Sequence, residues 1–329
     1  MQIVRNPGAC PRPPEGTVVT IGAYDGLHLG HRHVVSDVCE RARSGGHRSA
    51  LVTFDRHPGQ VVRPESAPLL LTNLDQRLEL LEGTGIDIVM VIHFDAQRAT
   101  ESAEDFVNEV LVDCLNTRHV VVGEDFHFGH RRSGNVALLA EMGSESGFGV
   151  SGVRLVGPDG EPARDDAQVS STAIRRALHE GRLADANAML GRPHEMRGPV
   201  VTGDGRGREI GFPTANVAIG PEMLMPADGI YAGRLIRLES SQGVPSESTE
   251  ELPSAVYIGH RPTFHTDGAA TLLEVHVLDL EADLYGEQVA VRFEHRIRGD
   301  QAFDTVDALV AQLSLDCDRS RELLRQDPS

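Results

Sequence analysis

A glycine-rich turn near the N-terminus constrains the fold of this chain more than any other feature. Residues 17–21 form a short β-branched run that predicts a buried strand, and the segment Gly-Ala-Tyr-Asp-Gly-Leu-His-Leu-Gly-His follows directly over residues 22–31. A helix-type pattern then covers residues 34–43. This order of strand, turn and helix start is typical of α/β folds that bind phosphate groups.

The turn contains the pattern His-x-Gly-His. His28 and His31 lie three residues apart, so they share one face of the first helical turn, and Gly30 leaves room for a ligand to approach the backbone. The pattern is that of enzymes that attack the α-phosphate of ATP and release pyrophosphate. Two polar helix-cap histidines are the alternative, and the motif alone leaves both open. A zinc site that uses His28, His31 and His33 lacks a complete ligand set with known spacing.

The length of 329 residues favours about two domains. No run of about 18 apolar residues occurs, so we expect no transmembrane helix and no membrane partner. The N-terminus lacks a hydrophobic signal core. Cys10, Cys39, Cys114 and Cys317 are far apart and form no Cys-x-x-Cys pair. We therefore expect a reduced, cytoplasmic protein without structural zinc.

The charge of the chain limits its partners. The net charge of −18 argues against a nucleic-acid partner, because a phosphate backbone requires a basic surface. All 31 basic residues are arginine, which excludes a Walker A loop, a protein-kinase strand lysine and a pyridoxal phosphate Schiff base. Any ATP chemistry here must therefore use histidine, arginine, metal ions and backbone dipoles.

The first half of the chain, to about residue 155, alternates strand-type and helix-type patterns. This alternation predicts a parallel sheet with helices on both faces. The predicted strands cover residues 17–21, 50–54, 86–92, 119–122 and 150–156. The predicted helices cover residues 34–43, 74–81, 103–115 and 136–142, and two more follow at 172–180 and 183–190.

The pattern changes near residues 191–193. Short β-type runs separated by turns follow, which predicts an antiparallel barrel or sandwich. These runs cover residues 198–202, 230–238, 255–258, 271–278 and 288–293. The polar residues 239–254 predict a flexible hairpin loop, and residues 305–324 predict a final helix.

Three further segments of the first half are candidates for the same site as the histidines. Asp55 and His57 close a predicted strand, and Asp125 closes another beside two phenylalanines. Ser171 and Thr172 precede an apolar-periodic helix, whose N-terminus would attract phosphate together with Arg175. A strand exit, a packed loop and a plain helix cap are the simpler readings. The order of the segments favours one nucleotide site bracketed by the His-x-Gly-His and Ser-Ser-Thr motifs.

The second half carries its own candidates. Thr214 and Asn216 lie two residues apart on an extended segment after a glycine-rich loop, so they point to the same side. A hydroxyl and an amide oxygen suit Mg²⁺ or phosphate oxygens. Glu274 lies in an alternating strand, and a phosphoryl-transfer enzyme needs such a group to orient or deprotonate the attacking hydroxyl. A β-turn and a solvent-facing glutamate are the alternatives.

Together these segments resemble the prokaryotic bifunctional riboflavin kinase/FAD synthetases, from about residue 16 to the C-terminal helices. The matching segments are GAYDGLHLGH, TFDRHP, VVGEDFHFG, SSTAIR, GREIGFPTAN, PADGIYA, IGHRPTF and EVHVLDLEADLYG. The resemblance implies a nucleotidylyltransferase-type, Rossmann-like parallel-sheet domain over residues 1–186. It also implies a six-stranded antiparallel β-barrel riboflavin kinase domain with a C-terminal helix over residues 187–329.

The resemblance further implies two reactions on the small molecules riboflavin, FMN and ATP. The barrel would phosphorylate riboflavin to FMN, with Glu274 as the base and with Thr214 and Asn216 binding Mg²⁺ and ATP. The first domain would move AMP from ATP onto FMN and release pyrophosphate, with His28 and His31 at the α-phosphate. The other residues expected to bind ATP or flavin are Gly22, Asp25, Gly30, Asp125, Ser171, Thr172, Arg175 and Gly211.

The departures from the family pattern are small. Tyr24 stands where phenylalanine is common, His260 where a small or polar residue is usual, and residues 299–301 are less acidic. None removes a residue of the expected chemistry. A monofunctional paralogue and a flavin-binding regulator without catalysis are the competing hypotheses, and the intact motifs argue against the regulator. The sequence does not indicate an oligomeric state.

Overall fold

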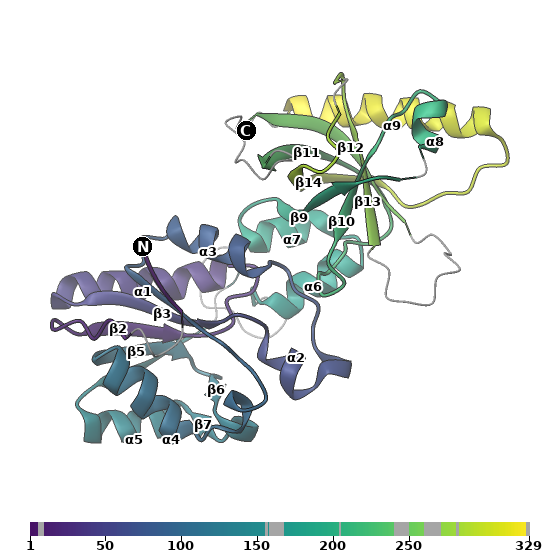
Figure 1. Cartoon of the computed structure of the whole chain (residues 1–329). Coiled ribbons are helices and arrows are strands. Elements are labelled where there is room, and N and C mark those ends of the chain that lie inside the picture. Colours follow the sequence, from purple (N-terminus) through teal and green to yellow (C-terminus); the bar gives the residue numbers. More distant parts are fainter. Residues whose placement is uncertain are drawn as a thin grey trace. The chain divides into compact units, whose positions relative to one another are not determined.

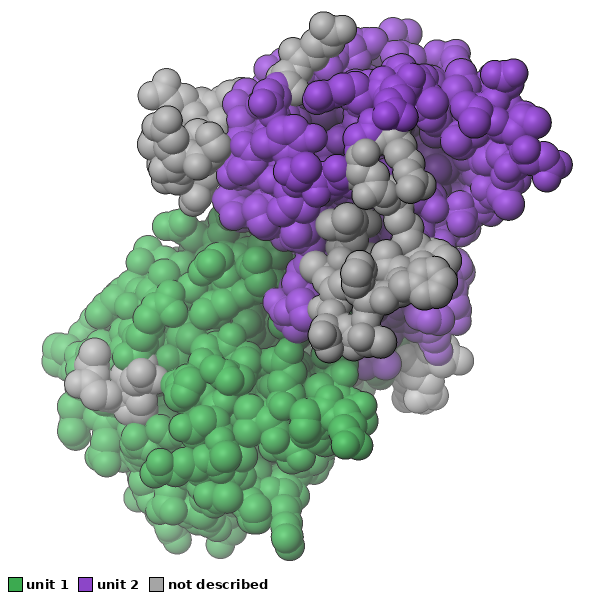
Figure 2. Space-filling view, turned by 45° about the vertical axis from the view of Figure 1, so that its right-hand side comes forward, with its two compact units in different colours: residues 1–171 green, residues 172–329 purple. Residues whose placement is uncertain are grey.

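The computed structural model describes residues 1–5, 10–154, 157, 168–203, 205–239, 250–259, 271–280 and 283–326. The chain forms two compact units, residues 1–171 and residues 172–329, which Figure 2 colours separately. Each unit is described by itself below.

The first unit contains a six-stranded parallel sheet in the order β1-β4-β3-β2-β5-β8. Figure 1 labels β2, β3 and β5 of this sheet. Its strands are β1 (Gln2–Arg5), β2 (Thr17–Ile21), β3 (Arg48–Phe54), β4 (Ile88–Ile92), β5 (Thr117–Gly123) and β8 (Gly149–Val153). The predicted parallel sheet is confirmed. The edge strand β1 was not predicted, because only Val4 of its four residues is buried and the run lacks a strand pattern.

Helices cover both faces of this sheet because alternate strand residues point to opposite sides. In β2, Val18 packs with α1 (Leu29–Gly45) and α3 (Leu74–Glu82). Val19 packs on the other face with α4 (Ala103–Phe106), the π-helical segment η4 (Val107–Cys114) and α5 (Val136–Ser146). The shorter elements are α2 (Pro58–Val62), η2 (Pro64–Ser66), η3 (Arg98–Thr100), β6 (His127–Phe128), η5 (His130–Arg132) and β7 (Gly134–Asn135).

The strand order of the sheet reverses between β2 and β5. From β2 the chain continues to β3 on one side, whereas β5 pairs with the other side of β2. In open parallel sheets, ligands bind at the carboxyl ends of the strands at such a reversal. The segments that follow β2 and β5 begin at Gly22 and Glu124. The histidine motif and the Asp125 segment therefore both lie at the carboxyl ends of these strands.

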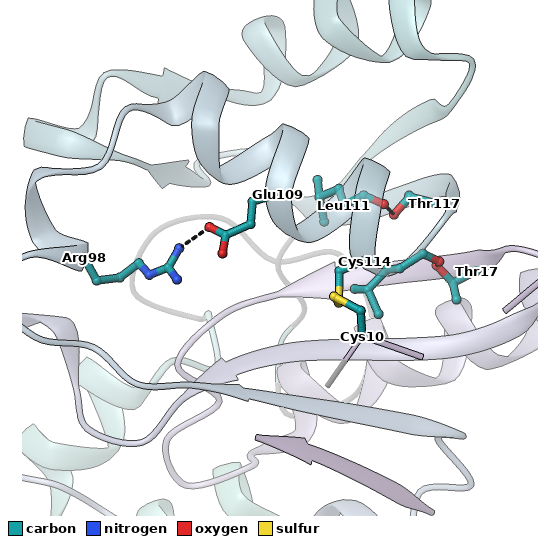
Figure 3. Close-up of a disulfide and its surroundings, with 8 residues drawn as sticks. Cys10, Thr17, Arg98, Glu109, Leu111, Cys114 and Thr117 are labelled. Carbon is teal, nitrogen blue, oxygen red and sulfur yellow. Dashed lines mark hydrogen bonds and ion pairs between the residues drawn. A yellow bond between two sulfur atoms is a disulfide. The ribbon is translucent and has the colours of Figure 1, made fainter. Parts of the chain in front are cut away.

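A disulfide joins Cys10 to Cys114 at the opposite edge of the sheet, where β2 and β5 begin (Figure 3). The expectation that all cysteines are reduced is therefore wrong for this pair. The two residues are 104 positions apart, but their Cα atoms are only 4.8 Å apart, because pairing of β2 with β5 brings their preceding segments together. Thr17 Oγ1 donates to the Leu115 carbonyl at 2.9 Å and joins the same segments. Cys39 and Cys317 are not in disulfides.

The second unit contains a closed antiparallel barrel in the order β10-β13-β12-β11-β14-β9 (Figure 1). Its strands are β9 (His194–Val201), β10 (Ala215–Ile219), β11 (Gly229–Glu239), β12 (Glu251–Ile258), β13 (Thr271–Val277) and β14 (Gln288–Arg298). Its helices are α6 (Ser171–His179), α7 (Leu183–Leu190), α8 (Arg206–Glu209) and α9 (Val306–Gln326). The six-stranded barrel and the final helix are confirmed, and the sandwich alternative is wrong.

The predicted hairpin loop 239–254 is only partly a loop. Residues 240–249 lie outside the described residues. Residues 251–254 belong to β12 instead, where they pair with residues 233–236 of β11. The polar composition misled the prediction, because Glu251 faces Arg292 of β14 in an ion pair and Ser254 is buried.

The helices α7 and α9 pack against the barrel. Tyr231 and Phe293 are fully buried, and their rings meet edge to face with centroids 5.3 Å apart. Asn187 of α7 joins the helix to two strands, because its amide nitrogen donates to the Phe293 carbonyl and its oxygen accepts from the His194 amide. No helix within the described ranges is long and apolar enough to span a membrane.

Candidate active site

The turn after β2 has an unusual backbone. Tyr24 and Leu27 have φ angles of 52° and 34°, and Gly26 between them has a φ of 81°. Non-glycine residues adopt such left-handed conformations at an energetic cost, so surrounding contacts must hold them in place. One of these contacts is the hydrogen bond between the hydroxyls of Tyr24 and Thr20, with an oxygen–oxygen distance of 2.5 Å.

The two histidines of the motif lie together at the start of α1. His28 is the N-cap residue, and its Nδ1 accepts a hydrogen bond from the His31 amide at 3.3 Å. Because Nδ1 accepts, the proton of a neutral His28 ring lies on Nε2. The rings are stacked with centroids 3.6 Å apart. The structure thus confirms that the two histidines share one face of the first helical turn. It also confirms the capping role that the alternative interpretation proposed for them.

Gly30 of the motif is buried among backbone and ring atoms. A Cβ at this position would lie 3.2 Å from the Val169 carbonyl oxygen and 3.3 Å from the His28 ring. A larger side chain would therefore displace His28 or the segment before α6. This close packing explains the glycine between the two histidines.

Asp25 lies beneath the turn, with only 3% of its surface exposed. Its carboxylate accepts hydrogen bonds from the amides of Leu71 and Thr72, at 3.0 and 2.9 Å, and from the Thr72 hydroxyl at 3.2 Å. The hydroxyl of Ser171 donates to the Asp25 carbonyl at 3.0 Å. The structure thus brings Ser171 to the histidine turn, as the sequence predicted. Thr172 and Arg175 continue α6 in the second unit.

The segments after β5 and β3 add two acidic groups at the carboxyl ends of the strands. Asp125 is exposed, and next to it Phe126 stacks on Phe128 with centroids 5.5 Å apart. Asp55 accepts from the Phe94 amide at 3.0 Å and contacts His93 Nδ1 at 2.6 Å. Burial raises the pKa of Asp55, but these hydrogen bonds and the adjacent positive charges outweigh burial and lower it.

In the second unit, a cavity of about 440 Å³ opens between the barrel and α9. Asn216 and Glu274 are directly paired across β10 and β13, and both line this cavity. Asn216 is 6% exposed. The other lining residues include Phe212, Thr214, Tyr257, Arg298, Asp300, Phe303, Leu313 and Cys317. The three predicted kinase residues therefore meet at one cavity.

A second cavity, of about 450 Å³, lies on the other side of the Pro-Thr-Ala-Asn segment. Its walls include Arg208, Pro213, Leu280, Asp283 and Tyr285. Thr214 lines both cavities. Gly211, just before this segment, has a φ of +89° and allows the turn that leads into it.

Sequence reasoning missed several residues around these sites. Arg298 binds the buried Asp316 of α9 at 2.7 Å at the wall of the first cavity. Burial, together with the charges of Asp300 and Glu274, raises the pKa of Tyr257 at the same wall. These contacts join distant parts of the chain, so no local pattern indicates them.

One missed residue in the first unit did have a sequence signal. Arg77 occupies the apolar stripe of α3 together with Leu74, Leu78 and Leu81, where a charged residue is unexpected. Its guanidinium is buried beneath the histidine turn. A charge on an apolar helix face is therefore the signal that would have identified it.

Comparisons with known proteins agree with this division of the chain. A family model described as FAD synthetase matches residues 10–173, and one described as riboflavin kinase matches residues 190–324. The bifunctional riboflavin kinase/FMN adenylyltransferase of Escherichia coli K12 is 36% identical over 94% of this chain and 93% of its own. The enzyme of that name from Haemophilus influenzae is 34% identical over 98% of each chain.

A solved structure from Streptococcus pneumoniae, described as a macrolide-efflux protein, also matches with a TM-score of 0.81 at 28% identity. The match covers 100% of both chains. The likeness concerns the whole fold, both the parallel sheet and the barrel.

The fold, the motifs and the family models together define a nucleotidyltransferase unit followed by a kinase unit, both of flavin-cofactor synthesis. The chain belongs to the family of bifunctional riboflavin kinases/FMN adenylyltransferases. It is a transferase that forms FMN from riboflavin and FAD from FMN.

Proposed function

We propose that the cavity around Glu274 binds riboflavin and that the adjoining cavity binds the ATP that phosphorylates it. The observation that carries this proposal is the position of Thr214, which lines both cavities. A phosphoryl group must pass between two bound substrates, so a residue shared by their sites lies where transfer occurs.

Glu274 then acts as the base of the kinase reaction. Its carboxylate accepts the proton of the terminal hydroxyl of the riboflavin side chain while that oxygen attacks the terminal phosphoryl group of ATP, whose bond to the β-phosphate breaks so that ADP leaves. Asn216, its direct partner across the strands, orients the phosphate oxygens. The turn at Gly211 positions the segment that carries both Thr214 and Asn216.

Mg²⁺ fits this site by the chemistry of its donors. The hydroxyl of Thr214 and the amide oxygen of Asn216 are hard oxygen ligands of the kind Mg²⁺ binds together with phosphates. Both side chains line the first cavity beside Glu274. Bound there, the metal ion would neutralise the charge that develops on the transferred phosphoryl group.

We further propose that the turn after β2 carries out adenylyl transfer. The FMN phosphate attacks the α-phosphorus of ATP, and pyrophosphate leaves. The Nε2–H of His28, the ring of His31 and the N-terminus of α1 stabilise the charge that develops on the α-phosphoryl oxygens. Gly22 and Gly30 contribute to this site by allowing close packing of the turn, because a Cβ would meet the Tyr24 ring at Gly22 and the His28 ring at Gly30. Asp125, Ser171, Thr172 and Arg175 contribute to binding ATP or FMN.

In this proposal both reactions act on small molecules and need no nucleic-acid or membrane partner. We also propose a cytoplasmic location. The test is an assay with riboflavin, ATP and Mg²⁺ in which FMN and FAD are separated over time. We expect FMN to appear first and FAD to follow, with two ATP consumed per FAD. No FMN from riboflavin would contradict the kinase site, and no FAD from added FMN would contradict the adenylyl-transfer site.

A further inference from the structure

The turn that presents His28 and His31 is attached to α3 by a buried arginine. Arg77 is 3% exposed, and its Nη1 donates to the Ala23 carbonyl at 2.5 Å and to Thr53 Oγ1 at 3.2 Å. The Thr53 hydroxyl in turn donates to the Ala23 carbonyl at 3.2 Å. One guanidinium thereby joins the end of β2, the end of β3 and a helix.

A second attachment lies two residues further along the turn. The buried Asp25 carboxylate accepts from Leu71 and Thr72, and the Thr72 hydroxyl accepts from the Gly26 amide at 2.9 Å. Residues 71 and 72 lie just before Asn73, the N-cap residue of α3, so both attachments fix the turn to the same helix. Tyr24 lies between the two attachments, and Leu27 follows the second. These are the non-glycine residues of this turn that have left-handed backbone.

The burial of this arginine is costly. Burial lowers the pKa of Arg77, and the charges of Asp25 and Asp55 offset only part of this effect. Its Nε has no hydrogen-bond partner among the residues that the structure describes. An apolar residue at this position of the helix would pack without that cost, so the charge is retained for something other than stability.

We propose that Arg77, Asp25 and Thr72 form a loop clamp that holds the strained turn in the conformation in which His28 and His31 meet the α-phosphate. This proposal rests on the adenylyl-transfer function proposed above. The three residues are positioning residues, because they act through the turn. The Asp25 carboxylate faces residues 71–72, so we assign it to the clamp and no longer to direct contact with ATP.

The test measures FMN adenylylation in full-length variants, with riboflavin phosphorylation by the same chains as an internal control for concentration. Amide hydrogen exchange of β2 and β5 is the control for folding of the first unit. In Arg77→Met we expect kcat for FAD formation to fall on the order of 10²-fold, because displacement of catalytic groups by about 1 Å has an effect of this size. We expect KM for FMN and for ATP to change less than about threefold, because the clamp touches neither substrate. Arg77→Lys should recover part of the loss.

Two matched variants separate positioning from general damage. Arg41→Met removes an arginine from α1 that forms an exposed ion pair with Asp37, and it should leave kcat unchanged. If Arg77→Met unfolds the first unit, the variants of Thr72 test the clamp instead. Thr72→Val removes the hydroxyl between Asp25 and Gly26 and should lower kcat, whereas Thr72→Ser keeps this hydroxyl and should retain kcat.

Folded Arg77→Met and Thr72→Val enzymes with kcat within about threefold of the parent would overturn the clamp. A rise in KM with unchanged kcat would overturn it as well, since it would assign these residues to substrate binding. A parent enzyme that forms no FAD would instead refute the proposed adenylyl-transfer site. The two failures are therefore distinguishable.

Discussion

At the scale of single residues, the two ring nitrogens of His28 differ in what they do. Nδ1 caps α1 by accepting from the His31 amide, and we propose that the Nε2–H of the neutral ring donates to a phosphate oxygen. Removal of this side chain would therefore combine the loss of a cap with the loss of the proposed catalytic donor. The two effects need separate variants.

We predict that His28→Ala and His31→Ala lower the rate of FAD formation by about 10²–10³ while FMN formation is retained. His28→Asn is the matched variant, because asparagine keeps an N-cap acceptor but removes the ring. It should remain folded and still fail in adenylyl transfer, as measured by FAD formed from added FMN. Parental FAD formation by His28→Asn would show that the ring serves only as a cap.

The opposite pattern is predicted for the barrel. Glu274→Gln removes the proposed base and should lower FMN formation by about 10²-fold or more, with FAD formation from added FMN unchanged. Glu287→Gln is a suitable control, because Glu287 is buried in an ion pair with Arg237 and is not among the residues of either described cavity. Equal losses in both variants would remove the assignment of Glu274 as the base.

His194 makes the stability of the second unit depend on pH. Burial lowers the pKa of His194 from 6.5 to about 4. Between these two pH values the ring is neutral in the folded state, whereas in the unfolded chain it binds a proton. Its contribution is fully present above pH 6.5 and is lost as the pH falls towards about 4. The loss amounts to about 3 kcal/mol at one pKa unit per 1.36 kcal/mol.

We therefore predict that His194→Phe, which can still stack on Phe293, weakens this pH dependence. The measurement is amide hydrogen exchange of the barrel strands between pH 7.5 and 5, corrected for the intrinsic pH dependence of exchange. The parent should lose more protection than the variant. The same loss in both proteins would show that other groups cause it.

At the scale of elements, the disulfide fixes the beginnings of two neighbouring strands. Cys10 precedes β2, and Cys114 ends the helical segment before β5 (Figure 3). The bond closes a loop of about 100 residues, and cross-links of this kind typically contribute about 2–4 kcal/mol by limiting the unfolded chain. This edge is opposite the histidine turn, so its effect is on stability rather than on chemistry.

We predict that reduction of the disulfide, or Cys10→Ser, destabilises the first unit by about 2–4 kcal/mol and leaves the second unit unchanged. Hydrogen exchange followed by mass spectrometry would compare β2 and β5 with the barrel strands in the same sample. Cys39→Ser is the control, because Cys39 is not in a disulfide. Unchanged protection of β2 and β5 after reduction would contradict the prediction.

At the scale of the whole molecule, the two units have separate cores and separate candidate sites. The sheet of the first unit carries the histidine turn, whereas both described cavities with kinase residues lie in the barrel unit. The helix α7 belongs to the barrel unit, since Asn187 bonds β9 and β14 and Leu183 and Ala186 are buried. A boundary at residue 187 cuts this helix.

We predict that residues 187–329 alone fold and convert riboflavin to FMN without forming FAD. Residues 172–329 should do the same with higher stability, because they keep α7 complete. The measurement is FMN formation together with thermal unfolding followed by circular dichroism. Fragments that are folded but inactive, and that residues 1–186 activate when added, would show that the first unit completes the kinase.

Much of this architecture follows from local sequence patterns. The β-branched run 17–21 and the helical periodicities predicted the parallel sheet. The short β-type runs of the second half predicted an antiparallel barrel or sandwich, and the family resemblance favoured the six-stranded barrel. These patterns succeed because burial of one strand or helix face leaves a period of about two or 3.6 residues in the sequence. Local motifs also singled out His28, His31, Thr214, Asn216 and Glu274 as candidates, and the resemblance to the family supplied the roles that we propose for them.

Long-range contacts decided the rest. Pairing of β2 with β5 brought Cys10 to Cys114, and the Glu251–Arg292 pair turned a polar segment into part of β12. The place of Arg77 beneath the histidine turn and of Thr214 between two cavities likewise depends on residues far along the chain. Sequence determines which residue types are present and their local periodicity. The distances between side chains from different elements are set only when the strands pair and the helices pack on them.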